Sequence, residues 1–276
     1  MPEISLKVPL KDLCAEFRRD VVQTLYHKQT GHPGGSLSVC EILAVLLLQK
    51  MNVRPEEPDW SERDRLILSK GHAAPMLYRI LAERGFFPVE ECETLRDFGT
   101  RLQGHPCMTS TPGVDMTSGP LGLGLSAGLG LAMGLRMQGL QGRVYVVLGD
   151  GEIDEGTIWE GAMAAAKYNP GNLIVIVDQN GVQLDGRTKD IMPSDDLRAK
   201  FEAFGWKTME CDGHDVDALS KAVDEAQTIT DKPVVILAHT VKGKGVSFME
   251  GQSTWHGKPI DMAHYEQAIT ELGGVH

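Results

Sequence analysis

The sequence lacks a paired cysteine motif, an excess of positive charge and an apolar leader. The five cysteines form no CxxC pair and no metal-type spacing, which suits reduced thiols in a cytosol. A net charge of −11 argues against a general nucleic-acid binder, because no basic face could easily dominate such a surface. The opening stretch MPEISLKVPLKDL has no continuous apolar core of the kind found in signal peptides, so a cytoplasmic protein is expected.

Long hydrophobic runs are also scarce. The stretch 116–135 carries no charge and is long enough to be a transmembrane candidate. It contains Pro120 and six glycines, however, which dilute its hydrophobicity. A buried, closely packed helix is therefore expected there, with the membrane span as the alternative. The glycines would let this helix pack closely against another subunit.

Strands and helices alternate along the chain, with no linker, charge block or internal repeat. Strands are predicted over 64–72, 142–150, 173–180 and 232–240, and helices over 11–29, 38–50, 155–168 and 215–229. This alternation predicts an α/β fold: a doubly wound, mainly parallel sheet with helices on both faces. One domain is expected over residues 1–276, with a C-terminal tail from about residue 257.

Common nucleotide-binding loops are missing too. No GxxxxGK[ST] occurs, which excludes a Walker loop, and no GxGxxG follows a strand and opens a helix. Instead, Gly149, Asp150 and Gly151 end one predicted strand, and Asn180 ends the next strand 30 positions later.

The spacing of Asp150 and Asn180 fits one strand–helix–strand unit. Ligands of such sheets bind beyond the carboxyl ends of the strands, and adjacent strands lie about 4.8 Å apart. A carboxylate, an amide oxygen and a backbone carbonyl would suit Mg²⁺, with Ca²⁺ or Mn²⁺ as substitutes and phosphate oxygens completing the shell. The alternative is a tight turn in which Asp150 only caps a helix. The strand context favours the metal–diphosphate site.

Four of the nine histidines lie in loops flanked by glycine or proline: His32, His72, His105 and His256. Loops over a rigid sheet often carry site residues, and imidazole can donate or accept a proton near neutral pH. These four are therefore candidate site residues. The other five are expected to be surface or structural residues: His27, His214, His239, His264 and His276.

Several sequence blocks resemble those of transketolases, in the same order along nearly the whole chain. They are TGHPGGSLSVCEIL, DRLILSKGHAAPMLY, LQGHPCMTSTPGVDMTSGPLGLGLSAGLGLA, GDGEIDEG with VDQNGVQLDG, and STWHGKP. The resemblance implies the thiamine-diphosphate-binding fold. It also implies that Mg²⁺ is held by Asp150, Asn180 and the carbonyl of Val182.

The same resemblance assigns roles to the remaining candidates. His72 and His256 would contact the diphosphate, and His32 and His256 would handle the proton of the sugar C3 hydroxyl. His105 would bind hydroxyls near C1. The other residues implied at the cofactor are Gly119, Leu121, Gly122, Gly149, Gly151 and Glu155, the last of them between the two cofactors of a dimer.

The implied activity is transfer of a two-carbon ketol unit from a ketose phosphate to an aldose phosphate, as in the pentose phosphate pathway. The pyrimidine-binding and C-terminal domains of transketolases have no counterpart here. We therefore expect them on a partner chain, in an α2β2 heterotetramer, with this chain inactive alone. Alternatives are a role with a branched or sulfonated sugar, and a non-catalytic scaffold subunit.

The roles of four other residues near these motifs are not assigned. Cys107 and Asp115 stand where many transketolases carry glutamate. Lys242 and Lys244 either add positive charge beside the site or lie in a solvated loop.

Overall fold

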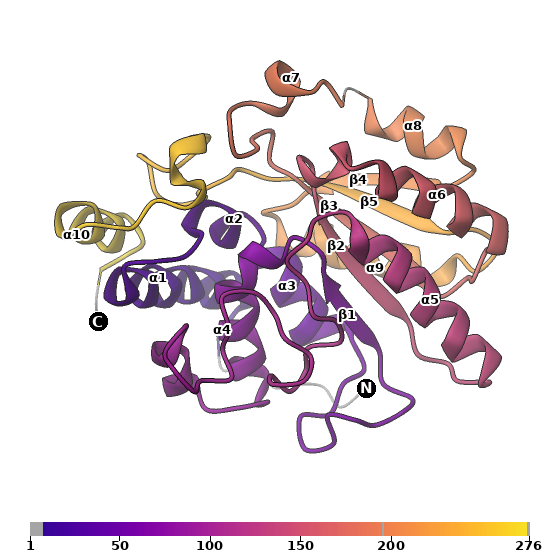
Figure 1. Ribbon diagram of the computed structural model, residues 1–276, viewed down its shortest axis with the longest axis horizontal. Coiled ribbons are helices and arrows are strands. Elements are labelled where there is room, and N and C mark those ends of the chain that lie inside the picture. The colour runs from indigo at the N-terminus through magenta and orange to yellow at the C-terminus, as the bar shows by residue number, and fades with distance from the viewer. Residues whose placement is uncertain (1–7, 195, 275–276) are drawn as a thin grey trace.

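A computed structural model describes residues 8–194 and 196–274. Five parallel strands form one sheet in the order β1-β2-β3-β5-β4 (Figure 1). Their bounds are β1 Arg65–Leu68, β2 Val144–Gly149, β3 Leu173–Gln179, β4 Lys207–Asp212 and β5 Val234–His239. The predicted α/β fold with a parallel sheet is confirmed.

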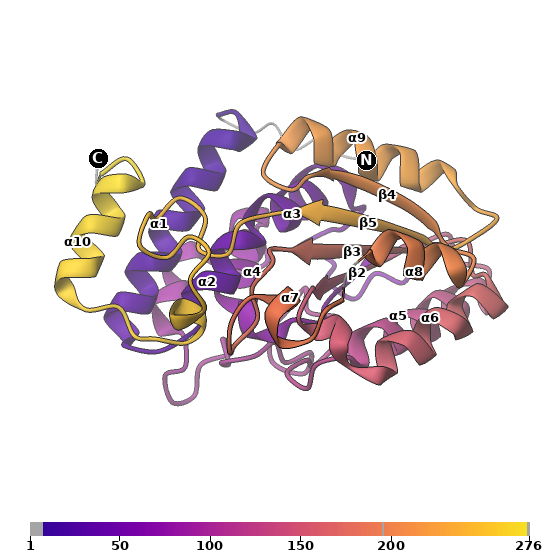
Figure 2. The same ribbon diagram turned by 90° about the horizontal axis from the view of Figure 1, so that it is seen from above.

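Helices cover both faces of the sheet, as Figure 2 shows from above. One face is covered by α3 (Cys40–Val45), α4 (Ala74–Arg84) and α9 (Val216–Thr228), with α1 (Leu10–Lys28) packed against α3 and α4, and the other face by α5 (Leu123–Met137), α6 (Gly156–Tyr168) and α8 (Leu197–Ala203). The remaining helices are α2 (Pro33–Ser38), α7 (Thr188–Ile191) and α10 (Met262–Glu271). Short turns of 3₁₀ helix occur at η2 (Gly71–Ala73), η3 (Val89–Thr94), η4 (Glu152–Asp154) and η5 (Ser253–His256).

The two hydrophobic cores follow from the period of two in the strands. In β2, Tyr145 and Val147 pack into the core under α1, α3 and α4, whereas Val144, Val146 and Leu148 pack under α5 and α6. Every residue of β2 is buried, as expected for a central parallel strand that is covered on both faces.

Several elements differ from the sequence expectation, and helices α4, α7 and α8 were not predicted. β4 was not predicted, because this edge strand is only partly buried and carries charged residues such as Glu210. The helix expected over 38–50 is divided into α3 and a π-helical turn, η1 (Leu46–Lys50). The expected tail from about 257 contains α10, which packs against α1. His276, expected to be a surface or structural residue, lies outside the described residues.

The glycine-rich stretch forms a helix packed on the sheet. Within the described residues, no helix is both long enough and apolar enough to cross a membrane. A Cβ atom on Gly128 would lie 2.4 Å from the Val146 side chain, and one on Gly124 would lie 2.3 Å from Ser69. These two glycines let α5 approach the sheet. Gly130 and Gly134 face open space instead.

Candidate active site at the carboxyl edge of the sheet

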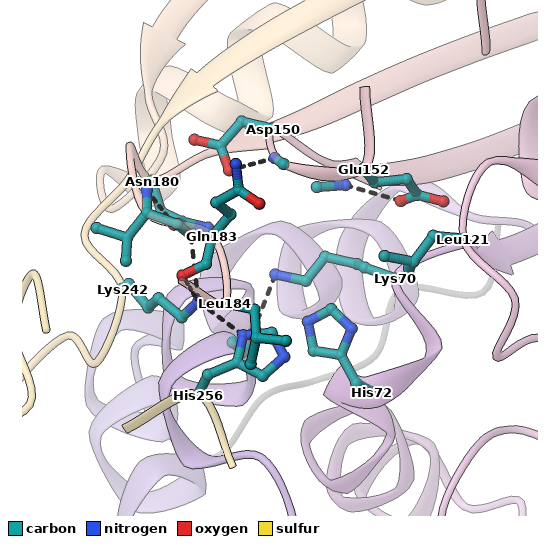
Figure 3. Close-up of a pocket in the computed structure, with 14 residues that line it drawn as sticks. Lys70, His72, Leu121, Asp150, Glu152, Asn180, Gln183, Leu184, Lys242 and His256 are labelled. Carbon is teal, nitrogen blue, oxygen red and sulfur yellow. Dashed lines mark hydrogen bonds between the residues drawn. The ribbon is translucent and has the colours of Figure 1, made fainter. Parts of the chain in front are cut away.

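Strands β2 and β3 bring the predicted acid and amide together. Gly149 pairs with Asp178 across the two parallel strands, so Asp150 and Asn180 both follow at the same edge. Both residues line a cavity of about 150 Å³ (Figure 3). The predicted meeting of the two strand ends is therefore seen in the structure.

Backbone amides hold the side chains of Asp150 and Asn180 in place. The Asp150 carboxylate accepts hydrogen bonds from the N–H groups of Gly151 at 2.9 Å and Gly181 at 2.5 Å. Burial, and then the nearby charge of Asp178, raises the pKa of Asp150 to about 7. The Asn180 Oδ1 atom accepts from the Val182 N–H group at 3.1 Å. A divalent cation would relieve the cost of burying the Asp150 charge.

The carbonyl of Val182 faces the side chain of Lys242. Lys242 Nζ donates to this carbonyl at 3.1 Å and to His256 Nδ1 at 2.9 Å (Figure 3). Burial, and then the charge of Lys70, lowers the pKa of Lys242 to about 8. Lys242 therefore lies beside the site and not in a solvated loop. Lys244 is partly exposed, and its Nζ atom lies 3.9 Å from Oε1 of Glu250.

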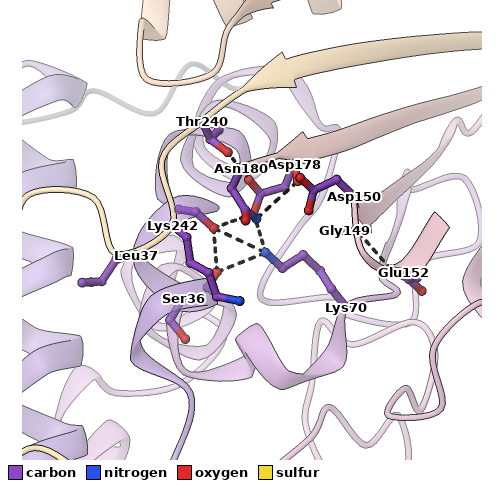
Figure 4. Close-up of polar contacts among 12 residues, drawn as sticks. Ser36, Leu37, Lys70, Gly149, Asp150, Glu152, Asp178, Asn180, Thr240 and Lys242 are labelled. Carbon is purple, nitrogen blue, oxygen red and sulfur yellow. Dashed lines mark hydrogen bonds and ion pairs between the residues drawn. The ribbon is translucent and has the colours of Figure 1, made fainter. Parts of the chain in front are cut away.

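A second lysine lies beneath the metal-type donors. Lys70 forms a buried ion pair with Asp178, which also accepts hydrogen bonds from the hydroxyls of Ser38, at 2.6 Å, and Thr240 (Figure 4). Burial alone would raise the pKa of Asp178, but Lys70 and these hydroxyls hold it below its ordinary value. Asp178 neutralises the charge of Lys70, so Lys242 remains as a cationic side chain at the pocket, and a divalent cation would add the positive charge that suits an anionic ligand.

The four loop histidines meet in one cluster. The ring centroid of His32 lies 5.5 Å from that of His72, 6.0 Å from that of His105 and 5.4 Å from that of His256. Those of His72 and His256 lie 4.8 Å apart. They come from four separate loops, so only the fold brings them together.

Burial keeps these rings neutral at physiological pH. Burial, and then Arg96, lowers the pKa of His32 to about 4, while burial and Lys242 lower that of His256 to about 3. The pKa values of His72 and His105 are lowered as well, mainly by burial. A neutral imidazole carries one donor nitrogen and one acceptor nitrogen, so these rings can form hydrogen bonds with ligand oxygens.

The hydrogen bonding of two rings follows from their contacts. His256 Nδ1 accepts from Lys242, so its proton is on Nε2. Within the ranges 8–194 and 196–274, His32 Nδ1 is buried and has no hydrogen-bond partner. A buried, unpaired ring nitrogen is costly. His32 contacts the ring of His72, but it does not itself line the cavity.

The expected cofactor turn lies beside the pocket. Leu121 lines the cavity, Gly119 packs near His105, and Gly122 has a φ of +86° that favours glycine. Gly151 also needs to be glycine, because a Cβ atom there would lie 2.7 Å from Gln183. Glu155 differs: it is exposed at the start of α6 and does not line the pocket.

Two other groups of residues have structural explanations. Cys14, Cys40 and Glu41 lie close enough to hold a metal ion, but both Glu41 oxygens already accept hydrogen bonds from Arg18 at 2.6 Å. Asp115 is buried and forms an ion pair with Arg63 at 2.6 Å, so it fixes the start of β1.

The remaining described histidines pair with acids away from the pocket. His27, His239 and His264 are near the surface and contact Glu93, Glu210 and Asp261, respectively. His214 is mostly buried and its Nδ1 lies 2.9 Å from Glu41. These positions agree with the expected surface or structural roles.

Sequence reasoning missed several residues at the site. Among them are Lys70, Glu152, Gln183 and Leu184, all of which line the cavity. Arg96 was not predicted either, and its charge helps to lower the pKa values of His32 and His105. Lys70 lies in the block DRLILSKGHAAPMLY, directly before Gly71 and His72. Its position next to a candidate histidine could have indicated a place at the site.

A parallel sheet with polar and charged side chains at its carboxyl edge is the arrangement in which doubly wound domains bind phosphorylated ligands. Residues 11–275 match the family model described as transketolase, thiamine diphosphate binding domain. The chain belongs to the transketolase family, and within it corresponds to the N-terminal, thiamine-diphosphate-binding part.

Known relatives include both short and long proteins. The chain is 46% identical over 266 residues to a 6-deoxy-6-sulfo-D-fructose transketolase subunit, SqwG, of Clostridium sp. (strain MSTE9), covering 96% of this chain and 97% of that protein. It is 38% identical over 255 residues to an apulose-4-phosphate transketolase subunit of Phocaeicola vulgatus, covering 92% and 90%.

Single-chain transketolases match over only part of their length. A crystal structure of a Pichia stipitis transketolase mutant superposes with a TM-score of 0.91 at 31% identity, covering 97% of this chain and 41% of that one. The Leishmania mexicana transketolase superposes with a TM-score of 0.91 at 28% identity, covering 97% and 42%. The expectation of an N-terminal transketolase subunit, a transferase, is confirmed.

Proposed function

We propose that this chain is the metal- and diphosphate-binding subunit of a two-chain transketolase. The complete enzyme would transfer a two-carbon ketol unit from a ketose phosphate to an aldose phosphate. The observation that carries this proposal is the register of β2 and β3, which brings Asp150 and Asn180 to one cavity beside Lys242 and His256.

Thiamine diphosphate, when bound, supplies the nucleophilic carbon and electron sink that cleavage of a carbon–carbon bond requires. The residues of this chain bind and orient it. Asp150, Asn180 and the Val182 carbonyl would hold Mg²⁺, because their oxygens form the hard donor set that this ion prefers. His72 and the ammonium group of Lys242 would contact the diphosphate oxygens.

The histidines would act on the sugar. His32 Nδ1 has no hydrogen-bond partner among the described residues, and the Nε2–H group of His256 can donate to an oxygen. We assign these two residues to the proton of the C3 hydroxyl. His105, at the edge of the cluster, would hold hydroxyls near C1. Gly119, Leu121 and Gly122 would form the turn beside the cofactor.

The small size of the cavity supports the proposal that a second chain completes the site. It measures about 150 Å³, whereas sites for drug-sized ligands usually span roughly 300–1,000 Å³. A partner carrying the pyrimidine-binding and C-terminal domains would complete the walls, as α2β2. Glu155 is exposed on this chain and would contact cofactors only across that interface. The cytoplasm is the proposed location, supported by the free thiols of all five cysteines.

A second candidate concerns the sugar. The relatives described above are named for a sulfonated sugar and for apulose 4-phosphate, so an unusual ketose is a candidate donor. Assays of the two-chain enzyme with ordinary and sulfonated ketose donors distinguish the two. The preferred donor is the one with the higher kcat/KM.

Calorimetry tests the proposal directly. Thiamine diphosphate titrated into the complex of this chain and its partner should give saturable heat with Mg²⁺ and none after the metal is chelated. The chain alone should show no ketol transfer. Heat that does not depend on a metal, or turnover by the isolated chain, contradicts the proposal.

A further inference from the structure

Glu152 is a buried carboxylate to which the proposed function assigns no role. It lies in η4, directly after Gly149, Asp150 and Gly151, and only 3% of it is exposed. A buried charge is costly unless hydrogen bonds satisfy it. Its partners therefore decide what it does.

Three donors converge on this carboxylate. Oε2 accepts from the Gly149 N–H group at 3.0 Å, and Oε1 accepts from the Gly122 N–H group at 2.9 Å and from the Ser69 hydroxyl (Figure 4 shows the Gly149 bond). Ser69 Oγ in turn accepts from the Gly124 N–H group at 3.1 Å. Because every partner donates, both oxygens of Glu152 must accept. A glutamine at this position would place its NH₂ group opposite one of these donors, so that one hydrogen bond would be lost.

These bonds close the N-terminus of α5. The first N–H groups of a helix need acceptors from outside its own backbone ladder. Gly122, the N-cap residue, has no side chain to provide one. Glu152 and Ser69, from two other segments, accept from Gly122 and Gly124 instead. A negative charge at this end also suits the helix dipole.

The segments joined by Glu152 form one wall of the cavity. Gly149, Leu121 and Glu152 all line it, and Figure 3 shows Leu121 and Glu152 side by side. A Cβ atom on Gly122 would lie 2.5 Å from Thr157 Oγ1, so the turn also packs tightly on its other side. A shift of this turn would move Leu121.

We infer that Glu152 is a positioning residue, which holds the Gly119–Gly122 turn against Gly149 in the arrangement that receives thiamine diphosphate. It acts through the turn. This inference rests on the proposed function. Its consequence is that Glu152 sets the affinity for the cofactor and leaves the chemical step unchanged.

The test uses Glu152→Gln, with Asp154→Asn as the matched control. Asp154 lies in the same short helix and is exposed. In Glu152→Gln, hydrogen–deuterium exchange over 122–124 should speed up at least about tenfold, because a buried donor loses its partner. In the assembled enzyme, the KM for thiamine diphosphate should rise about tenfold with kcat retained, as expected for a lost buried hydrogen bond. Asp154→Asn should change neither quantity.

Each other outcome overturns the inference. Faster exchange with an unchanged KM would leave Glu152 as a helix cap only, and a lower kcat with an unchanged KM would assign it to the reaction. Ser69→Ala breaks the same link more mildly and replaces Glu152→Gln if that variant does not fold. If the unmodified enzyme fails to bind thiamine diphosphate, the proposed function fails too. Loss of affinity confined to the variants separates the two cases.

Discussion

Two buried charged clusters differ in how completely their groups are paired. In the Arg18–Glu41–His214 cluster, Arg18 donates to both Glu41 oxygens at 2.6 Å, and His214 Nδ1 lies 2.9 Å from Glu41. His214 Nε2 accepts from the Val241 N–H group at 2.8 Å, so its Nδ1 carries the proton that Glu41 accepts. This cluster is closed.

The pocket cluster, formed by Lys70, Asp178, Asp150 and Lys242, is open in the sense that its charged groups have partners but polar atoms beside it do not. Around it, in the part of the chain that the structure describes, His32 Nδ1 and Gln183 Nε2 are buried without hydrogen-bond partners. Unpaired buried polar atoms cost free energy, which a ligand can recover. We therefore expect the closed cluster to stabilise the fold and the open cluster to bind a ligand.

The largest expected effect comes from breaking the closed cluster. Glu41→Ala leaves the buried Arg18 charge unpaired, and loss of one partner of a buried pair typically costs about 3–5 kcal/mol. The free energy of unfolding, measured by urea denaturation, should fall by that amount. Glu57→Ala is the control, because Glu57 and its partner Arg54 are both exposed and their ion pair should contribute little.

The pH dependence of stability sharpens this prediction. Burial alone would raise the pKa of Glu41, but His214 and Arg18 bring it below the ordinary 4.5. Such a carboxylate contributes stability that is present above its unfolded pKa and is lost as pH falls through the lower folded value. Below pH 4.5, the free energy of unfolding of Glu41→Ala should therefore fall less steeply with falling pH than that of the unmodified protein. An unchanged acid limb contradicts the assignment.

The next effect falls on the open cluster. Asp150→Asn should lower the affinity of the assembled enzyme for thiamine diphosphate with Mg²⁺ by at least about 100-fold, because losses outside the ligand shell alone cost about 10–100-fold. Its free energy of unfolding should change by only about 1 kcal/mol, the usual net value of a hydrogen bond. Calorimetry and urea denaturation measure the two quantities.

Asp185→Asn, an exposed change in the neighbouring loop, controls for charge alone. A large loss of stability in Asp150→Asn with affinity retained would reverse the comparison, since it would make Asp150 a structural residue.

Thiol reactivity contrasts Cys107, two positions after His105, with Cys40 beside the closed cluster. Hydrogen bonds from Ser110, and then Thr109, lower the pKa of Cys107 to about 7, whereas burial raises that of Cys40, beside the closed cluster. At pH 7, Cys107 should react with iodoacetamide about three- to tenfold faster than a free cysteine, because more thiolate outweighs its lower nucleophilicity. The rate should rise through pH 7 and level off above it.

Mass spectrometry of the alkylated peptides checks this assignment. Cys107→Ser should remove the fast phase, and Cys40 should stay unmodified in the folded chain. Fast labelling of Cys40 would show that the closed cluster opens readily.

Several residues of the site could be predicted from sequence because they follow strand ends. Asp150 and Asn180 each end a recognisable apolar run, and the rule for parallel sheets brings such ends together. The four loop histidines carried their own signal in flanking glycine and proline.

The rest depends on contacts between distant segments. Lys70 and Asp178 are 108 positions apart, and no local pattern pairs them. Glu152 lies in a turn where a sequence predicts a solvated acid, and only the approach of α5 buries it. Edge strand β4 was missed for a related reason: its half-exposed residues follow no clear period.

The smallest expected effect contrasts two glycines of α5. A Cβ atom on Gly128 would clash with Val146, whereas one on Gly134 meets nothing within 4 Å among the described residues. Gly134→Ala should therefore raise the free energy of unfolding of the isolated chain by about 0.8 kcal/mol through helix propensity, and Gly128→Ala should lower it. If another subunit packs on this face, as the glycines suggest, Gly134→Ala should also weaken assembly, which sedimentation measures. Unchanged assembly would place that interface elsewhere.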